Sequence, residues 1–562
     1  MSVMEKGDVR ELPTGHLVLF LHAHLPYVRH PEHEDFLEED WLYEAITETY
    51  LPLLMKMDAW VRAKHPARIT MSVSPPLSEM LSDPLLMGRY HVRLERLIRL
   101  AEKEVKRTAR DERFASTATM HLERLSQCAH AFNEVYSRDL LGAWTGLQGE
   151  GVLELATCSA THAFLPHFAA DPAFVRAQIR IAIEAHRAHF GRHPPGIWLP
   201  ECGYYPGLDQ FLADEGLCYF FVDAHGVLNA DPAPVHGTMS PIICPSGVLA
   251  FPRDPESSQQ VWSADSGYPG DGRYLEFYRD AGHDLSPEEL EGFVLPDGGR
   301  RNVGLKYHRI SARHIPLDEK EPYDRAAALE AVDTHAGNFV FNRTHQIDHW
   351  RRVMGRSPVV VSPYDAELFG HWWAEGPEFI DLVMQKAIYD QDVFRMSTPS
   401  DVIHSGLDFQ AAQPSMSSWG AGGYGEVWLN EKNDWIFEAI SEASAEFQRL
   451  LTHYPTPSAL QRTYFGQLGR ELLLASASDW PFILTMGTSV GYAEAQVRRH
   501  LERFDIVRQS LLLDGKTEAS DILARMERVD DMLTIADRDR IFLTYDYRLF
   551  LEHFAPIWRD HP

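Results

Sequence analysis

Short apolar runs recur along the chain, and most of them end in a histidine, a carboxylate or an arginine. Runs of this kind, bounded by Pro, Gly or polar residues, are typical of buried strands. They lie at residues 16–21, 69–74, 152–157, 197–199, 217–222, 248–251, 260–262, 359–361 and 393–396. Helical patterns separate several of them, which predicts βα units around a parallel sheet.

The polar residues at the run ends favour a closed barrel. Parallel α/β barrels build their active sites at the carboxy-terminal ends of the strands. His24, His162, Glu201, Arg253 and Asp365 all follow apolar runs closely, which a random scatter of polar residues would not produce. We therefore predict an α/β fold with a barrel of about seven or eight strands, formed by residues 1–83 and 140–405.

Two other regions have helical periodicity. Apolar residues recur at helical spacing within residues 84–139, which predicts a helical insertion in the barrel. A segment rich in Gly, Ser, Gln and Ala begins at residue 406, and no strand pattern follows it. Helical spacing then returns at Val497, Leu501, Phe504, Val507 and Leu511. Residues 406–562 are therefore expected to form an α-helical C-terminal domain.

Charge and composition exclude several classes of partner. The net charge is −28, from 53 basic and 81 acidic residues, which disfavours binding to a nucleic-acid backbone. No run approaches the ~18 apolar residues of a membrane span, and the first 15 residues lack the apolar core of a secretory signal. The five cysteines form no CxxC pair. We expect reduced thiols, a cytoplasmic location and no membrane partner.

Glu201 and Asp365 are the candidate catalytic pair. Each ends an apolar run, in WLPECGY and in SPYDAELFGHWW. Cleavage of a glycosidic bond needs two carboxyl groups with different roles, roughly 5–5.5 Å apart in a retaining enzyme. The alternative for either residue alone is a salt bridge or a helix cap. The apolar and aromatic neighbours of Asp365 favour a raised pKa and the role of acid/base, which leaves Glu201 as the ionised nucleophile.

His22 and His24 form an HxH pair that allows three interpretations. A metal site could be completed by His162 or His225. Alternatively, only one of the pair points into the barrel and the other packs. In the third interpretation, His24 and His162 form hydrogen bonds with sugar hydroxyls.

Several tryptophans stand beside glycines or charged residues, and aromatic rings stack on sugars. Trp419 lies among four glycines in SWGAGGYG, with little local core to join, which favours a binding role. Trp262 and Trp373 have similar polar surroundings, whereas Trp428 and Trp480 fit core packing equally well. The same glycines do not form a phosphate-binding loop, because no strand precedes them and no Lys-Ser/Thr follows.

Five motifs together resemble the glycoside hydrolase family 57 enzymes, and within that family the 1,4-α-glucan branching enzymes. They are HAHLPY (22–27), ATHAFLP (161–166), WLPECGY (198–204), SPYDAELFGHWW (362–373) and SWGAGG with VWLNEKNDW (418–435). The motifs are long and stand in the family's order. The resemblance runs from about residue 16 to about residue 490.

The resemblance implies a (β/α)7 barrel, a retaining mechanism with Glu201 as nucleophile and Asp365 as acid/base, and no metal or cofactor. It implies an α-1,4-glucan such as amylose, amylopectin or glycogen as partner, and we expect a monomer. The glucan-contacting residues that it implies are Arg253, Gly270, Trp419 and Asp479, with His24, His162, Trp262 and Trp428 as further subsite residues.

One segment departs from the family's pattern. Many of its branching enzymes carry a long loop tipped with a tyrosine, and here residues 229–247 contain no Tyr, Phe or Trp. Such a loop helps to exclude water from the covalent intermediate. The alternatives to branching are therefore a family 57 hydrolase, a 4-α-glucanotransferase and, less strongly, a non-catalytic glucan-binding protein.

Overall fold

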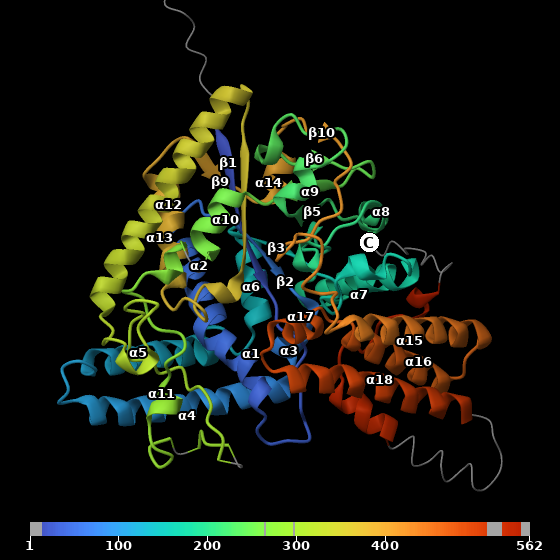
Figure 1. Ribbon diagram of the computed structural model, residues 1–562, viewed down its shortest axis with the longest axis horizontal. Coiled ribbons are helices and arrows are strands. Elements are labelled where there is room, and N and C mark those ends of the chain that lie inside the picture. The colour runs from blue at the N-terminus through green and yellow to red at the C-terminus, as the bar shows by residue number, and fades with distance from the viewer. Residues whose placement is uncertain (1–13, 264–265, 291, 296–297, 514–530, 552–562) are drawn as a thin grey trace, which may run out of the picture.

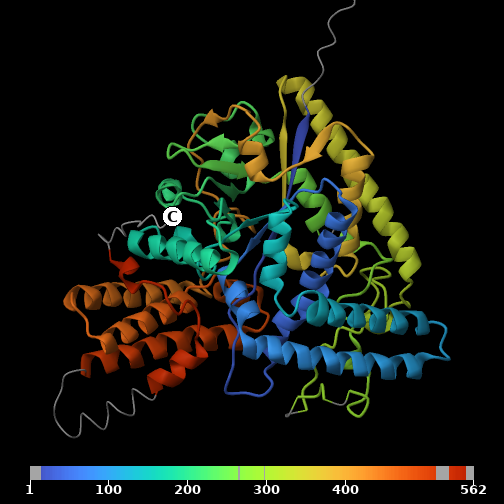
Figure 2. The ribbon, with the colours of Figure 1, turned by 180° about the vertical axis from the view of Figure 1, so that it is seen from behind.

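The computed structural model describes residues 14–263, 266–290, 292–295, 298–513 and 531–551. Seven parallel strands form its centre, in two groups (Figures 1 and 2). In the first, β1 lies between β8 and β2, and β3 follows β2; in the second, β5 lies between β4 and β7. The strands are β1 (Gly15–Ala23), β2 (Ile69–Val73), β3 (Leu153–Ala156), β4 (Gly196–Ile197), β5 (Tyr219–Val222), β7 (Leu249–Pro252) and β8 (Val359–Asp365).

Backbone hydrogen bonds join the two groups into a ring. On one side, Thr157 pairs with Ile197 and accepts from the N–H of Trp198 at 2.8 Å, which connects the end of β3 to β4. On the other, the N–H of Asp254 donates to the carbonyl of Val361 at 2.8 Å, which connects β7 to β8. The order around the ring is β1-β2-β3-β4-β5-β7-β8, which confirms the predicted (β/α)7 barrel.

Along each strand, successive side chains point alternately to the inside of the barrel and to the surrounding helices. Val18 and Phe20 of β1 belong to an interior cluster with Trp198, Phe221 and Val361. The intervening outward residues of the strands pack against the helices in two larger clusters. Most strand residues are thus buried on both faces, so they read as continuous apolar runs in the sequence.

Helices cover the barrel and lie mainly in the connections between its strands (Figure 1). Some helices that follow a strand are short and have a proline in their first turn, as α10 (Pro255–Trp262) does. The principal covering helices are α1 (Asp40–Ala45), α2 (Leu51–Ala63), α3 (Pro75–Ser82), α6 (Leu140–Gly149), α7 (Pro172–Phe190), α8 (Leu208–Asp214), α9 (Ala224–Leu228), α10 (Pro255–Trp262), α12 (Arg325–Met354), α13 (Gly376–Tyr389) and α14 (Pro399–Ile403). The short helix α11 (Ala281–Asp284) lies near α4 (Pro84–Thr108), away from the barrel strands (Figure 1).

The insertion at residues 84–139 is helical, as predicted. It consists mainly of α4 (Pro84–Thr108) and α5 (Ala115–His130), which lie side by side at one end of the molecule (Figures 1 and 2). Asp83 caps α4 by accepting from the N–H groups of Leu85 and Leu86, and Pro84 occupies its first turn.

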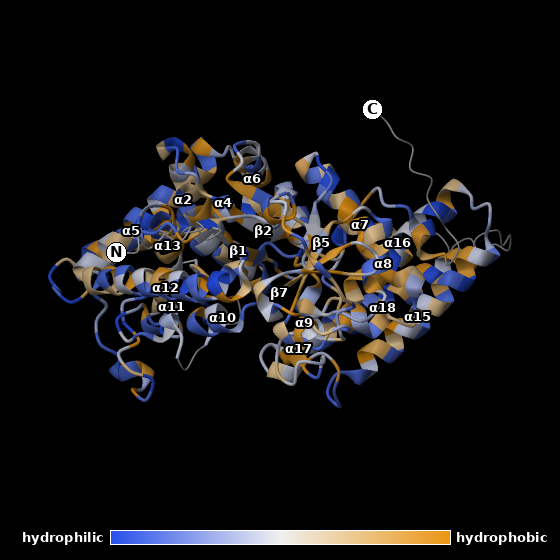
Figure 3. Cartoon of the chain, turned by 90° about the horizontal axis from the view of Figure 1, so that it is seen from above, coloured by the Kyte–Doolittle hydropathy of each residue, from blue (hydrophilic) through white to orange (hydrophobic). Residues whose placement is uncertain are grey.

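The C-terminal region is a helical bundle on the opposite side of the barrel. It contains α15 (Asp434–His453), α16 (Ala459–Ala475), α17 (Asp479–Met486) and α18 (Val490–Leu513). In the view from above, α15 and α18 are banded in apolar and polar colours (Figure 3). Their apolar residues pack against α7 and the outward residues of β4 and β5 in one cluster. The predicted α-helical C-terminal domain is confirmed.

Two sequence predictions were wrong. Residues 260–262 form the last turn of helix α10, not a strand, because Asp254 caps the helix and Pro255 starts it. Strands also do not stop at residue 405. Gln410–Ala411 form β10, which pairs with β6 (Ile242–Ile243), and β6 pairs antiparallel to β7. The remaining short strand, β9 (Phe394–Met396), pairs with the start of β1.

Among the described residues, no helix is long and apolar enough to cross a membrane.

Candidate active site

Glu201 stands at the carboxy-terminal end of β4 in a strained turn. Trp198 packs inside the barrel and Leu199 packs outside it, so the chain arrives with both faces buried. Pro200–Cys202 then form a short 3-10 turn in which Glu201 has φ 61° and ψ 23°. A side chain with positive φ is strained, and such strain is retained where the surrounding structure holds it. The turn aims the carboxyl group at the mouth of the barrel.

Two donors from the C-terminal third of the chain bind the Glu201 carboxyl group. The indole Nε1–H of Trp419 donates to Oε2 at 2.5 Å, and the hydroxyl of Ser478 donates to Oε1 at 3.0 Å. The backbone N–H of Trp419 also donates to the carbonyl oxygen of Glu201 at 2.8 Å. Both carboxyl oxygens are therefore acceptors, an arrangement that favours the ionised form.

Burial disfavours the ionised form of both Glu201 and Asp365. It raises the pKa of Glu201 to about 8, with the charges of Asp365 and Asp479 adding to the rise and the two hydrogen bonds reducing it. Burial raises the pKa of Asp365 to about 6, while the nearby His24 and Arg253 lower it. The two carboxyl groups are close enough to influence each other, as the candidate catalytic pair requires.

The expected order of the two pKa values was wrong. The sequence argument gave Asp365 the more apolar setting because aromatic residues flank it. In the structure Tyr364, Phe369 and Trp373 point into the outer core, away from the carboxyl group. Burial thus raises the pKa of Glu201 further than that of Asp365.

Three histidines line the mouth of the barrel. His24 stacks on His162 with ring centroids 3.7 Å apart, and His22 stacks on both rings. Of the three interpretations of the HxH pair, the one in which a single histidine points inward was wrong, because residues two apart on an extended strand share a face. His24 Nε2 lies 3.1 Å from Asp479, at the first turn of α17.

Two groups of side chains here have the composition of metal ligands. They are His22, Cys158 and His162, and His24, His162 and Asp479, with ligand atoms within 4.8 Å of one another. Every imidazole nitrogen of the three histidines already has a hydrogen-bond partner: Ser72, Ser74, Ser478, Asp479 or another histidine. The donors and acceptors are matched as a hydrogen-bond network without an ion.

Arg253 and Trp419 form the opposite side of the site. Arg253 follows β7 and makes a 3.1 Å ion pair with Asp223, which follows β5. Its guanidinium lies 5.7 Å from the centre of the Trp419 ring. The loop that carries Trp419 needs its glycines, since Gly420, Gly422, Gly423 and Gly425 all have positive φ.

A cleft of about 610 Å³ opens beside Asp365. Trp262, 62% exposed, and Gly270 line it together with Asp365 and Trp372. Trp262 stands at the last residue of α10 and Gly270 in a 3-10 turn shortly after it. The structure therefore brings both predicted substrate-binding residues to one cleft with a candidate catalytic residue.

Trp428 does not face the cleft, which corrects its prediction as a subsite residue. Only 1% of the residue is exposed, and its ring stacks on Phe164 at 5.2 Å. It packs in a small cluster with Val427 and the partly buried Trp419. Trp480 and Trp373 are likewise buried, so these rings pack in the core and do not line the cleft.

Sequence reasoning missed two polar residues. Ser478 precedes the predicted Asp479 and binds Glu201 directly. Glu367 lies two residues after Asp365, where its Oε1 accepts from the Tyr50 hydroxyl at 2.5 Å and from the His24 N–H at 3.1 Å. Burial raises the pKa of Glu367 to about 8. Its position within SPYDAELFGHWW was the available signal.

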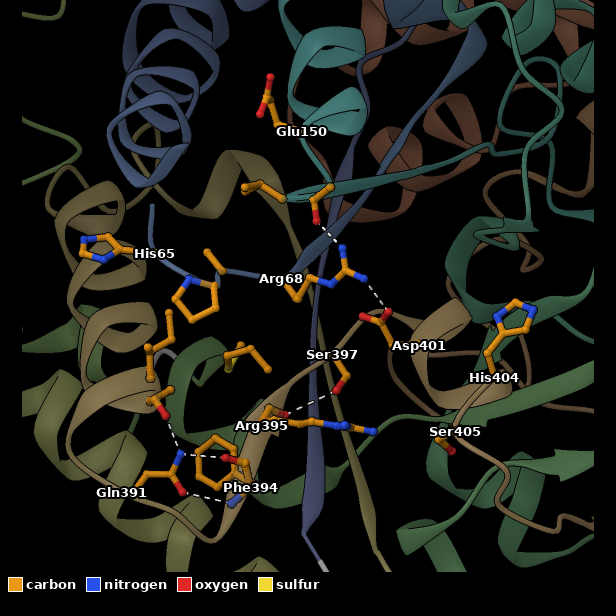
Figure 4. Close-up of a pocket in the computed structure, with 17 residues that line it drawn as sticks. His65, Arg68, Glu150, Gln391, Phe394, Arg395, Ser397, Asp401, His404 and Ser405 are labelled. Atoms are coloured by element: carbon orange, nitrogen blue, oxygen red, sulfur yellow. Dashed lines mark hydrogen bonds and ion pairs between the residues drawn. The ribbon is translucent and has the colours of Figure 1, made fainter. Parts of the chain in front are cut away.

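A second large pocket lies at the other end of the barrel. Its volume is about 720 Å³, and its walls include Arg68 and Val152, the residues just before β2 and β3 (Figure 4). Arg68 spans from the carbonyl of Gly151 to Asp401, with which it makes a 2.6 Å ion pair. This pocket contains neither candidate catalytic carboxyl group.

A (β/α)7 barrel with two buried carboxyl groups and an aromatic-lined cleft at the carboxy-terminal ends of its strands defines a protein built for glycoside chemistry. The comparisons with known proteins agree. Residues 18–416 match the family described as glycosyl hydrolase family 57, and residues 439–550 match the family described as 1,4-alpha-glucan branching enzyme, C-terminal. The chain belongs to glycosyl hydrolase family 57.

Curated relatives extend over most of the chain. It is 32% identical to the 1,4-alpha-glucan branching enzyme of Thermococcus kodakarensis over 92% of this chain and 77% of the relative. It is 30% identical to a probable 1,4-alpha-glucan branching enzyme of Mycobacterium tuberculosis over 94% of this chain and 98% of the relative.

Solved structures agree on the fold but differ in their described activity. The alpha-amylase AmyC from Thermotoga maritima is 41% identical, with a TM-score of 0.88 over 96% of this chain and 100% of the other. A branching enzyme from Pyrococcus horikoshii is 28% identical, with a TM-score of 0.84 over 96% and 98% of the two chains.

Proposed function

We propose that the protein is a 1,4-α-glucan branching enzyme with a retaining mechanism. Glu201 attacks the anomeric carbon of an α-1,4-linked glucan, and Asp365 protonates the departing oxygen. Asp365 then takes the proton from the 6-hydroxyl of an acceptor glucan, which displaces Glu201 and forms an α-1,6 linkage. The double displacement keeps the α configuration.

The observation that carries this proposal is the pairing of Glu201 and Asp365 at one barrel mouth, with donors supplied by the C-terminal region. The hydrogen bonds support the division of roles. Trp419 can only donate, and together with Ser478 it occupies both oxygens of Glu201. No described residue donates a hydrogen bond to the carboxyl group of Asp365, which lines the open cleft and is free to exchange a proton with substrate.

The two pKa values support a shared proton. With values of about 8 and about 6, the pair holds one proton between those pH values. Because the pKa of Glu201 is the higher of the two, that proton rests mainly on Glu201, and the two donors on Glu201 lower the free-energy cost of passing it to Asp365. A retaining reaction requires the form in which Asp365 carries the proton at its start.

The remaining parts of the site fit an uncharged glucan. Trp262 offers an exposed ring for stacking, and Arg253, His24 and Asp479 offer charged or polar groups to sugar hydroxyls. We include Gly270 and Trp419 in the same binding surface, whereas both ring nitrogens of the buried His162 are bonded to His22 and Ser478 and none is left for a sugar hydroxyl. The proposal includes a monomer that needs no metal or other cofactor, and a cytoplasmic role in glycogen or related α-glucan synthesis.

A second candidate is a family 57 α-glucan hydrolase. The 41% identity to an α-amylase favours it. So does the segment 229–247, which has no aromatic residue and is held by pairing of β6 with β7 and β10, rather than projecting as a loop tipped with a tyrosine. With less exclusion of water, the glycosyl-enzyme ester would be hydrolysed more often.

Incubation with amylose separates these functions. Branching predicts new α-1,6 linkages, seen as short chains after treatment with a debranching enzyme, with few new reducing ends. New reducing ends without α-1,6 linkages would identify a hydrolase, and redistributed linear chains would identify a 4-α-glucanotransferase. Retained glucan binding with no product of any kind would leave only a binding protein.

A further inference from the structure

A continuous line of buried side chains leads from the barrel wall to Glu201. Ser72 Oγ lies 2.7 Å from His22 Nδ1, and His22 Nε2 lies 2.9 Å from His162 Nε2. His162 Nδ1 lies 2.7 Å from Ser478 Oγ, which donates to Glu201 at 3.0 Å. Ser72, His22, His162 and Ser478 are at most 4% exposed, and they come from β2, β1, the loop after β3 and the turn before α17.

Only one order of donors satisfies this line when Glu201 is ionised. A carboxylate can only accept, so Ser478 donates its single hydroxyl proton to Glu201. Ser478 must then accept from a proton on His162 Nδ1. Burial keeps the pKa of His22 and His162 well below the usual value, so each ring is neutral and carries one proton. The lone pair of His162 is therefore on Nε2, and it accepts from His22 Nε2–H.

The same argument assigns the proton between His22 and Ser72, at the far end of the line from Glu201. With its proton on Nε2, His22 has its lone pair on Nδ1, which accepts the hydroxyl proton of Ser72. The position of the proton on each side chain thus determines which atom donates in the next hydrogen bond. The negative charge of Glu201 therefore sets the tautomer of His162 through Ser478, and the tautomer of His22 through Ser478 and His162.

We propose that Ser72, His22, His162 and Ser478 form one directional hydrogen-bond chain that positions a donor on Glu201 and favours the ionised form needed for attack. This inference rests on the proposed role of Glu201 as nucleophile. The four members are positioning residues, since they act on the reacting carbon through Glu201. Hereafter they are called the relay.

The relay resists the wrong protonation state. If Glu201 carried a proton on Oε1, it would donate to Ser478, and the whole line would have to reverse. Reversal moves the proton of His162 from Nδ1 to Nε2 and that of His22 from Nε2 to Nδ1, so both buried rings change tautomer. Uptake of a single proton at Glu201 therefore requires rearrangement at four other side chains.

Other groups around Glu201 act on its charge as well. Asp365 on β8 and Asp479 on α17 repel it, and Trp419 donates to its second oxygen. His162 Nδ1 lies 3.8 Å from Oε1 in addition to its contact with Ser478. The relay supplies the hydrogen-bond donor on Oε1, which favours the negative charge of Glu201, whereas Asp365 and Asp479 disfavour it.

Variants of the relay separate positioning from loss of structure. Ser478→Ala removes the donor, which raises the pKa of Glu201, and it is expected to move the alkaline limb of the kcat/KM profile up by about one pH unit. The acidic limb stays in place, and Ser478→Thr restores the profile. Ser476→Ala is the matched control, because this equally buried serine bonds to Leu473 and Gln178 and not to the site.

Ser72→Ala tests the remote end, where nothing touches substrate. It should shift the same limb in the same direction by a smaller amount. Thr70→Val is its control on the same strand, since no described residue bonds to the buried Thr70 hydroxyl. An unchanged alkaline limb in Ser478→Ala, or equal shifts in Ser72→Ala and Thr70→Val, would overturn the relay.

Neutron diffraction of the wild-type protein at about pH 9, where Glu201 is ionised, gives a readout that needs no activity. Deuterium is expected on His22 Nε2 and His162 Nδ1, with the Ser478 deuterium directed at Glu201. The opposite tautomers, or a doubly protonated ring, would refute the relay even in an active enzyme. Expected tautomers in a protein that cleaves no glucan would refute the proposed function and leave the relay standing.

Discussion

Trp419 donates its indole N–H to Glu201 across 218 residues of sequence, at 2.5 Å. The same tryptophan also binds the backbone carbonyl of Glu201 through its own N–H. Two bonds between one residue pair fix both the strained turn and the orientation of its carboxyl group. The barrel supplies the proposed nucleophile, and a glycine-rich loop outside the barrel strands holds it.

Trp419→Phe keeps the ring and removes this donor. A hydrogen bond to a charged group contributes about 1.5–3 kcal/mol, so kcat/KM should fall roughly 10- to 100-fold. Steady-state kinetics on amylose measure the loss. Trp435→Phe on α15 is a control that keeps the site intact, and an equal loss in both variants would contradict a role for the Trp419 N–H.

Glu201→Gln should abolish turnover and stabilise the fold at neutral pH. Burial raises the pKa of Glu201 to about 8, so the folded state holds its proton more tightly than the unfolded chain. The resulting stability is present at low pH and is lost as pH rises from about 4.5 towards 8. Removing the titration should increase the free energy of unfolding above pH 7 by on the order of 1–3 kcal/mol.

Chemical denaturation at pH 5 and pH 8 checks this sign. The difference between Glu201→Gln and wild type should be larger at pH 8 than at pH 5. Asp365→Asn should also abolish turnover, with a smaller pH-dependent gain because its pKa is raised only to about 6. Wild-type turnover in either variant would refute the assignment of the pair.

The activity of the wild-type enzyme should follow a bell-shaped pH profile. One proton on the carboxyl pair is needed, and the pair holds one proton between about pH 6 and about pH 8. Activity is lost below this window when both groups are protonated, and above it when neither is. A profile of kcat/KM on a soluble maltooligosaccharide locates the limbs, and a flat profile from pH 5 to 9 would contradict the shared proton.

Trp262→Ala should weaken substrate binding more than chemistry. Trp262 lines the cleft and is 62% exposed, and it lies far in the sequence from both Glu201 and Asp365. Loss of a stacking surface should raise KM about 5- to 50-fold with kcat changed much less. Phe341→Ala is the matched control, since this 59% exposed ring on α12 does not line the cleft. A fall in kcat alone would place Trp262 elsewhere in the reaction.

Much of the barrel could be read from the sequence because its strands are buried on both faces. Seven apolar runs correspond to the seven barrel strands, and Glu201 and Asp365 stand at the ends of two of them. The error at residues 260–262 arose because a short apolar run cannot be told from the end of a helix by periodicity alone. The Asp254 cap and Pro255 were the signal that decided it.

The site was less predictable where contacts join distant segments. Nothing local to Ser478 or Ser72 indicates a bond to a carboxyl group or a histidine in another element. Trp428 was misassigned because the family resemblance that implied a subsite does not reveal that its ring packs under the glycine loop against Phe164. The order of the two pKa values failed for the same reason, since the aromatic neighbours of Asp365 turn away from it.

The position of the two donors in the chain has a consequence for synthesis. The barrel strands are complete once Asp365 has emerged from the ribosome, whereas Trp419 and Ser478 are translated later. Until then the nascent barrel carries the proposed nucleophile Glu201 without either hydrogen bond, and we expect it to be inactive. Exchange of the C-terminal region between relatives would for the same reason transplant part of the chemistry together with the helices.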